Sequence, residues 1–318
     1  MGLSIIFVNY HTEDFIYRAV SSLYQYLTDF KFEVIVVNNS IKSDLQKLNT
    51  FNDYTNFKII NNTGNYGFSS GCNLGAMNSN YEYFLFLNPD VELVDDSIKK
   101  LYDYHLKNND IGISSGLMMY RDTTLQYCFN YFPNISWELY HLIATGYNQK
   151  IKKLLSRKEI ALGETFEVDW FHGAFFMISK KDFFNVEGFN EKYFMYYEDV
   201  EICFKVKKKL KKKNVCVPYV RILHEERSSV KENTNDDIYY FHINRSKLLF
   251  LRNYSKLKAF SMRTVSLIAI VLRIISLPFW KKHKGHAQNK LKQLLKILRL
   301  YVSKNAVNNT KFEFISNA

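Results

Sequence analysis

The sequence has few cysteines and lacks several of the motifs that would define a protein class at once. Its four cysteines, Cys72, Cys128, Cys203 and Cys216, form no CxxC spacing and no paired framework, which excludes a disulfide scaffold. The chain also lacks the GKS of a P-loop and the GxGxxG fingerprint of dinucleotide-binding proteins. It contains no internal repeat and no low-complexity linker.

The N-terminus has no charged leader, no apolar segment of signal length and no cleavage site. It continues directly into the apolar stretch Leu3–Val8, so we expect a cytoplasmic protein. With 47% hydrophobic and 16% aromatic residues, the 318-residue chain can form a substantial core. This length fits one large domain with an extension, or two domains.

Acidic residues are almost absent from the C-terminal quarter. Residues 238–318 contain sixteen Lys and Arg and one acid, Glu313, whereas the first 237 residues contain 27 basic and 30 acidic residues. The net charge of +12 therefore belongs to the tail. A basic tail on a near-neutral domain is typical of an attachment device. A nucleic-acid partner is not expected, because the positive charge lies among apolar segments without a recognisable binding module.

The first 120 residues alternate between strand and helix patterns, which predicts an α/β fold with a mostly parallel sheet flanked by helices. The predicted strands are Leu3–Val8, Glu33–Val37, Phe57–Ile60, Tyr83–Leu87 and Ile111–Ser114. One predicted helix follows Thr12 and contains Phe15, Ala19, Leu23 and Leu27 at helical spacing. A second predicted helix opens at Asp95–Ser97.

The alternation of strand and helix patterns ends over residues 119–165, where we expect loops and short helices. A second ordered block spans residues 166–220. It includes the apolar run Gly173–Ile178 and a helix that starts near Glu198 and ends in the lysine run Lys205–Lys213.

The tail, residues 236–318, is apolar and basic. Arg263, Arg273 and Pro278 interrupt the apolar segment Ala259–Trp280, which argues against a membrane-spanning helix. Leucines between residues 291 and 300 alternate with lysines, the pattern of an amphipathic helix in a membrane interface. We expect contact with an anionic membrane surface. The alternative is that these helices pack on their own domain or form a homodimer.

Polar side chains follow the fourth predicted strand, in Asn88-Pro89-Asp90. Ligands of open α/β sheets bind beyond the carboxyl ends of strands, and Asn88 and Asp90 can both face one hard cation. The same sequence also occurs in ordinary turns. His224, after a later strand pattern, is a structural residue or a nitrogen ligand of the same cation.

Two further segments carry candidate chemistry. Gly67, Gly71 and Gly75 permit close backbone approach at a helix start, where free N–H groups favour a phosphate. Glu198 and Asp199 are adjacent acids at the start of a helix. One of them can take the proton of a substrate hydroxyl, or both serve only as helix caps.

Five ordered motifs together resemble the family 2 glycosyltransferases, and in particular the rhamnosyltransferase-like branch of bacterial surface-polysaccharide synthesis. The motifs are Ser4–Tyr10, Val34–Ser40, Asn65–Gly75, Leu87–Val91 and Gly188–Glu201, and the resemblance covers about residues 3–230. It implies the GT-A fold and a catalytic domain over residues 1–235. It also implies a dTDP- or UDP-linked sugar donor, a divalent cation (Mn2+ or Mg2+) and an inverting transfer.

The resemblance also assigns roles to residues. The donor would be bound by Val8, Asn9, Tyr10, Asn38, Asn39, Asn65, Gly67, Asn73, Asn88 and Asp90. The metal would be held by Asp90 and Asn88, with His224 as a further ligand. Asp199, supported by Glu198, matches the general base, and Trp170, His172 and Gly173 fall where the family lines the acceptor site.

Two positions depart from the family pattern. Asn38 replaces the usual aspartate after the second strand, and Asn88 replaces the first aspartate of the metal motif. The first change affects base recognition, and the second leaves one fewer negative charge on the cation. We expect a peripheral enzyme at the inner face of the cell membrane that acts on a glycan or lipid-linked acceptor. The alternative is a non-catalytic GT-A-fold subunit that binds a glycan or a partner.

Overall fold

The computed structural model describes residues 2–41, 45–134, 153–225, 236–254, 256–277 and 287–303. The chain divides into two compact units. The first contains Met1–Phe132, Lys153–Phe194 and Glu198–Lys231, and the second contains Pro133–Lys152, Met195–Tyr197 and Glu232–Ala318. The second unit thus includes the basic tail and also three residues that directly precede Glu198.

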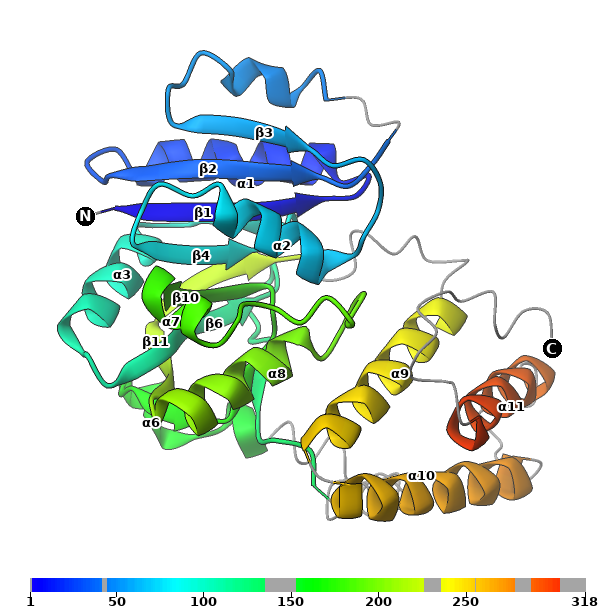
Figure 1. Ribbon diagram of the computed structural model, residues 1–318. Coiled ribbons are helices and arrows are strands. Elements are labelled where there is room, and N and C mark those ends of the chain that lie inside the picture. The colour runs from blue at the N-terminus through cyan, green and yellow to red at the C-terminus, as the bar shows by residue number, and fades with distance from the viewer. Residues whose placement is uncertain are drawn as a thin grey trace. The chain divides into compact units, whose positions relative to one another are not determined.

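A sheet of nine strands, counted over the described residues, forms the centre of the first unit (Figure 1). Its order is β3-β2-β1-β4-β10-β6-β11-β5, with β8 paired to β11. The strands are β1 (Leu3–Asn9), β2 (Phe32–Asn38), β3 (Phe57–Asn61), β4 (Tyr83–Leu87), β5 (Val91–Glu92), β6 (Ile111–Met119), β8 (Phe166–Val168), β10 (Phe175–Ser179) and β11 (Lys213–His224). A separate pair joins β7 (Phe129–Asn130) to β9 (Trp170–Phe171).

Neighbouring strands from β3 to β4 are all parallel, as are β6 and β11. Strand β10 runs antiparallel between β4 and β6. The registers Asn9↔Asn38 and Asn38↔Asn61 bring the carboxyl ends of β1, β2 and β3 to one edge. The predicted α/β architecture with a mostly parallel sheet is confirmed.

Helices flank this sheet (Figure 1). They are α1 (Glu13–Tyr26), α2 (Phe68–Met77), α3 (Ser97–Lys107), α6 (Lys158–Leu162), α7 (Lys180–Asn185) and α8 (Glu198–Lys205), with a short 3-10 helix at Leu48–Phe51. Helix α2 lies close against β1 and β2 because two of its residues are glycines. A Cβ atom at Gly75 would lie 2.5 Å from Ile6, and one at Gly71 would lie 2.8 Å from Val8.

Strands β1, β2 and β4 agree with their predicted bounds to within one residue, whereas β6 is longer than predicted. Strand β6 continues five residues past the predicted Ser114 to Met119, and every residue in it is buried. The helix predicted to start near Glu198 does end within the lysine run. Helix α8 ends at Lys205, a π-helical turn follows at Val206–Leu210, and Lys211 has a φ of 58°. This left-handed residue reverses the chain, so that Lys213 already begins β11.

After β6 ends at Met119, the described part of residues 119–165 contains β7, the helical residues 153–155 and α6, in line with the prediction of loops and short helices. Residues 135–152 lie outside the described residues. The core of the first unit joins both faces of the sheet to its helices. It includes Phe7, Val36, Phe86, Phe175 and Ile222, all fully or almost fully buried.

The second unit contains the helices α9 (Asp236–Tyr254), α10 (Lys256–Ser276) and α11 (Ala287–Val302). Its small core consists of Phe241, Leu248, Ile270, Leu300 and Tyr301. Arg263 on α10 donates to the carbonyl oxygens of Tyr301 (2.6 Å) and Ser303 (3.3 Å) at the end of α11.

By length and composition alone, one stretch of the described helices, Ala259–Ser276, could cross a membrane. Its mean hydropathy is 1.7, and 22% of it is buried. Arg263 and Arg273 both lie within this stretch. Contact of the tail with a membrane surface stays a prediction.

Candidate active site

A ladder of asparagine side chains crosses the carboxyl ends of the first three strands. Asn9 Nδ2 donates to Asn38 Oδ1 (3.0 Å), and Asn38 Nδ2 donates to Asn61 Oδ1 (3.0 Å). Asn9 Oδ1 also accepts from the backbone N–H of Thr12 (3.0 Å), which fixes the turn before α1. The amides of Asn9 and Asn38 are therefore engaged inside the protein, and both side chains are buried. Tyr10, the next predicted donor residue, is 47% exposed.

Asn39 ties the end of β2 to the glycine segment before α2. Its Nδ2 donates to the carbonyl oxygen of Gly67 (3.0 Å), and its Oδ1 accepts from Asn62 (3.1 Å). Asn65 Oδ1 accepts from the N–H of Gly67 (3.0 Å). Gly67 itself has a φ of 90°, and a Cβ there would lie 2.3 Å from the carbonyl oxygen of Phe194. A side chain at this position would clash with the backbone of Phe194, so the close approach of the two segments requires glycine.

Asn73 on α2 faces a neighbouring loop. Its Oδ1 accepts from the N–H of Phe189 (3.0 Å), and its Nδ2 donates to the Phe189 carbonyl (2.9 Å) and to Glu191 (3.0 Å). Gly188, with a φ of 59°, packs so closely that a Cβ would lie 2.8 Å from Asn73 Oδ1. The contacts of Asn73 therefore hold the segment that leads toward the acidic pair.

The predicted cation ligands Asp90 and His224 meet at the end of the sheet. His224 Nε2 lies 3.4 Å from Asp90 Oδ1, and both side chains are buried. Gln126 fixes the imidazole, because its Nε2 donates to the His224 carbonyl (2.6 Å) and its Oε1 lies 2.7 Å from His224 Nδ1. Nδ1 therefore carries a proton, and in the neutral imidazole Nε2 presents its lone pair to Asp90.

This geometry fits a divalent cation. Two acceptor atoms facing each other are stabilised by a positive charge between them, and neighbouring donors at about 2.1 Å from one ion lie roughly 3–3.5 Å apart. Within the described ranges, no three His, Cys, Asp or Glu side chains cluster to hold a metal. Asp90 and His224 are therefore the two side chains here that could hold a cation, and Asn88, two residues before Asp90, stays a predicted further ligand.

Asn88, two residues before Asp90, is joined by hydrogen bonds to the segment before β10, which in turn contacts Asp199. Its N–H donates to the carbonyl of Ala174 (2.9 Å), and the N–H of the preceding Gly173 donates to Asp199 Oδ2 (2.9 Å). A hypothetical Cβ at Gly173 would be 3.5 Å from Asp199 Cβ. The structure therefore brings Asn88, Gly173 and Asp199 to one segment of the fold.

The two adjacent acids differ in their surroundings. Glu198 is buried, and its Oε2 has no hydrogen-bond partner among the residues that the structure describes. Burial, and after it the charge of Asp199, raises the pKa of Glu198 well above its usual range. Burial raises the pKa of Asp199 to about 6, while the N–H groups of Gly173 and Val200 oppose the shift. At neutral pH we therefore expect an ionised Asp199, the state that a general base requires, beside a Glu198 whose protonated form is favoured.

Trp170 and His172 form a stacked pair beside Gly173. Their ring centroids are 5.4 Å apart with an interplanar angle of 12°, and Tyr127 contacts the His172 ring edge-on at 5.5 Å. Trp170 Nε1 donates to the carbonyl of Tyr131 (3.0 Å), which fixes the indole. The predicted acceptor residues Trp170 and His172 thus directly precede Gly173, whose N–H donates to Asp199.

The sequence did not indicate Gln126 or the contact of Gly67 with Phe194. Gln126 lies 98 residues before His224, in a region without a periodic pattern, so no local signal marks it. Val8 is buried and packs toward Gly71 of α2.

Comparison with known proteins agrees with this arrangement. The family model described as glycosyl transferase family 2 matches residues 4–183, more than half of the chain. The protein therefore belongs to glycosyl transferase family 2.

Among curated proteins, the chain is 32% identical over 210 residues to the low-salt glycan biosynthesis hexosyltransferase Agl10 of Haloferax volcanii, covering 65% of this chain and 62% of that protein. It is 28% identical over 212 residues to the rhamnosyltransferase WbbL of Escherichia coli, covering 64% and 75%. The resemblance to a rhamnosyltransferase-like branch is confirmed.

Among solved structures, GalNAc-T7 with UDP, GalNAc and Mn2+ superposes with a TM-score of 0.60 at 15% identity, covering all of this chain and 56% of that one. The predicted GT-A fold is confirmed by this likeness. The chain spans less than two thirds of the length of Agl10 and of GalNAc-T7.

Proposed function

We propose that the protein is an inverting glycosyltransferase that moves a sugar from a nucleotide-diphosphate donor to a glycan or lipid-linked acceptor. The observation that carries this proposal is Asp199, an ionisable carboxylate with a pKa of about 6, oriented by the N–H of Gly173 beside the stacked Trp170–His172 pair. Rhamnose is the sugar that the likeness to WbbL supports, and the likeness to Agl10 supports a hexose.

In this proposal Asp199 removes the proton of the acceptor hydroxyl as the hydroxyl oxygen attacks the anomeric carbon. The attack comes from the face opposite the leaving diphosphate, which gives one displacement with inversion. Glu198, kept protonated by burial and by the charge of Asp199, adds no second negative charge beside the base. A positioned base contributes roughly 10²–10⁴-fold to the rate.

Asp90 and His224, with Asn88, would hold Mn2+ or Mg2+ against the donor diphosphate. Such a cation acts as a Lewis acid and neutralises the charge that develops on the leaving oxygen. The phosphates would lie near the Asn65–Gly67 segment, whose path Asn39 fixes. UDP and dTDP are the nucleotides that we propose for the donor.

The proposal is tested by thermal shift with UDP, dTDP and GDP, each with and without Mn2+. A ligand at about 100 times its dissociation constant adds about 2.7 kcal/mol to the stability of the folded state. We expect a metal-dependent shift with UDP or dTDP that Asp90→Ala abolishes and Asp199→Asn retains. No shift with any nucleotide would favour the alternative, a non-catalytic subunit that binds a glycan or a partner.

We further propose that the second unit attaches the protein to an anionic membrane at the inner face of the cell membrane, where a lipid-linked acceptor would reside. Its helix α10 exposes Leu257, Phe260 and Ile275 at 77%, 71% and 63%. Lys292 and Arg299 on α11 are exposed cations, and anionic lipid attracts basic residues.

Sedimentation with anionic and neutral liposomes at two salt concentrations tests this attachment. We expect salt-sensitive binding to anionic liposomes that Phe260→Ser weakens and that Leu162→Ser, an exposed leucine of the first unit, leaves unchanged. Binding to duplex DNA in place of liposomes would contradict the proposal. Concentration-dependent dimerisation that Phe260→Ser abolishes, without liposome binding, would instead identify α10 as a homodimer contact.

A further inference from the structure

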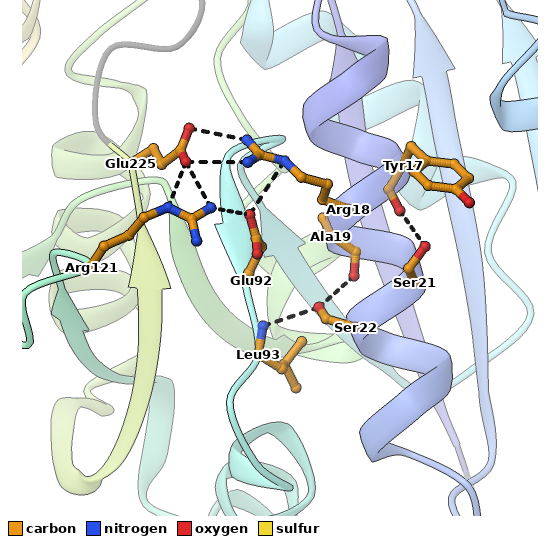
Figure 2. Close-up of polar contacts among 9 residues, drawn as sticks. All are labelled: Tyr17, Arg18, Ala19, Ser21, Ser22, Glu92, Leu93, Arg121 and Glu225. Atoms are coloured by element: carbon orange, nitrogen blue, oxygen red, sulfur yellow. Dashed lines mark hydrogen bonds and ion pairs between the residues drawn. The ribbon is translucent and has the colours of Figure 1, made fainter.

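Two arginines and two glutamates form a closed ring of ion pairs (Figure 2). Arg18 lies 3.4 Å from Glu92 and 3.0 Å from Glu225. Arg121 lies 2.6 Å from Glu92 and 2.7 Å from Glu225. Each arginine therefore contacts both glutamates, and each glutamate contacts both arginines.

The ring joins segments that are far apart in the sequence but carry the proposed cation ligands. Glu92 on β5 lies two residues after Asp90, and Glu225 directly follows His224 at the end of β11. The backbone makes the same connection, because the N–H of Glu225 donates to the carbonyl of Asp90 (3.0 Å). The register pairs His224 with Val91.

Helix α1 provides a rigid support for this strand end. Ser22 lies one helical turn after Arg18, and its hydroxyl accepts from the N–H of Leu93 (3.0 Å) while donating to the carbonyl of Ala19 (2.7 Å) (Figure 2). The segment that follows Asp90 is thus fixed to α1 by the ion pair of Glu92 with Arg18 and by the hydrogen bond from the Leu93 N–H to the Ser22 hydroxyl.

Stability alone gives little reason for this arrangement. The four side chains are between 22% and 51% exposed, and ion pairs that water reaches to this extent contribute little to the stability of a fold. The ring also has no net charge, so it adds little attraction for a cation at a distance. What it does is restrict where the ends of β5 and β11 lie relative to each other.

We propose that Arg18, Glu92, Arg121 and Glu225 are positioning residues that hold Asp90 and His224 at the spacing a divalent cation needs. This inference rests on the proposed cation-dependent donor binding. Partners that orient metal ligands typically change metal affinity by about 10-fold or more when they are lost.

The sign of the effect distinguishes positioning from charge. If the ring acted only through its charges, Glu225→Gln would weaken Mn2+ binding and Arg121→Met would strengthen it. If it positions the ligands, both variants weaken binding about 10-fold, and the double variant is no worse than either single one. The assay is titration of the full chain with Mn2+ alone, with free Mn2+ measured by electron paramagnetic resonance.

The matched control is another exposed ion pair of the first unit, Lys213 with Asp110 (2.8 Å). Asp110→Asn and Lys213→Met should leave Mn2+ binding unchanged. Tighter binding in Arg121→Met, or unchanged binding in both ring variants, would overturn the inference. Thermal unfolding of each variant shows whether a loss of affinity reflects loss of the fold.

A second measurement separates failure of the inference from failure of the proposed function. If the wild-type protein binds no Mn2+, the proposed cation role fails, and hydrogen exchange of the Glu225 amide decides the inference about the ring. Exchange at least about 10-fold faster in both ring variants, with no change in the control variants, supports it. Unchanged exchange overturns it.

Discussion

Replacing Asp199 by asparagine removes a carboxylate whose pKa burial raises from 3.8 to about 6. An acid with a raised pKa in the folded state binds its proton more tightly there than in the unfolded chain. Its contribution to stability is therefore lost as the pH rises from 3.8 to about 6. Two pKa units correspond to about 3 kcal/mol, so the ionised Asp199 destabilises the protein by about that amount at neutral pH.

The asparagine also has a cost that does not depend on pH. Asp199 accepts from the N–H groups of Gly173 (2.9 Å) and Val200 (2.7 Å), and an amide offers one oxygen where the carboxylate offers two. An unsatisfied buried N–H costs about 1–3 kcal/mol. Because this term is constant, the change with pH reports the loss of the Asp199 charge, which affects its own titration and also the raised pKa of Glu198. Relative to wild type, Asp199→Asn should gain about 2–3 kcal/mol between pH 4 and pH 7.

Urea unfolding of both proteins across this pH range measures the difference. Asp110→Asn is the matched control, since a hydrogen bond from Lys213 lowers the pKa of Asp110 and its removal should not reproduce the effect. In activity assays, the wild-type rate should rise with pH through about 6, and Asp199→Asn should lose about 10²–10⁴-fold while still binding nucleotide. Parallel stability curves for wild type and Asp199→Asn would refute the assignment of the raised pKa.

Three further substitutions test the scaffold of the site. Gly67→Ala should destabilise the first unit by about 3 kcal/mol or more in urea unfolding, because its Cβ would meet a backbone oxygen at 2.3 Å. Gly163→Ala is the control: Gly163 has a φ of 70° but open space around it, so this change should cost only about 1 kcal/mol. Asn38→Asp should lower the unfolding free energy at pH 7 by about 1–3 kcal/mol, measured likewise, because a carboxylate cannot donate. Asn88→Asp should tighten Mn2+ binding in a direct titration, since it adds a negative charge; unchanged affinity would remove this residue from the cation site.

Sequence patterns predicted most of the sheet, because buried parallel strands are short apolar runs. The strands around Ile5, Val36 and Phe86 were located within a residue or two. The turn at Lys211 was missed because its cause is tertiary. The chain must reverse there to place β11 beside β6, and nothing in a run of lysines marks the residue with positive φ.

The candidate site divides in the same way. Asp90, Asp199 and His224 follow strands or begin a helix, so their position in the local pattern marked them. Gln126 and Arg18 were not marked, since their contacts with His224 and Glu225 span 98 and 207 residues. Residues that act on a ligand are visible in a motif, whereas residues that orient them depend on contacts made only after folding.

The asparagine ladder gives the departure at position 38 a physical meaning. Asn38 donates to Asn61 Oδ1 and to the carbonyl of Ser40 (3.1 Å), and it accepts from Asn9 and from the N–H of Ser40 (3.1 Å). An aspartate in this place would face two acceptor oxygens with no proton to give. Asn38 is therefore a matched part of this sheet edge. If the chain binds a nucleotide donor as proposed, recognition of the base would rely more on accessible side chains at the same edge. Tyr10 is the most exposed of those that the family resemblance places around the nucleoside.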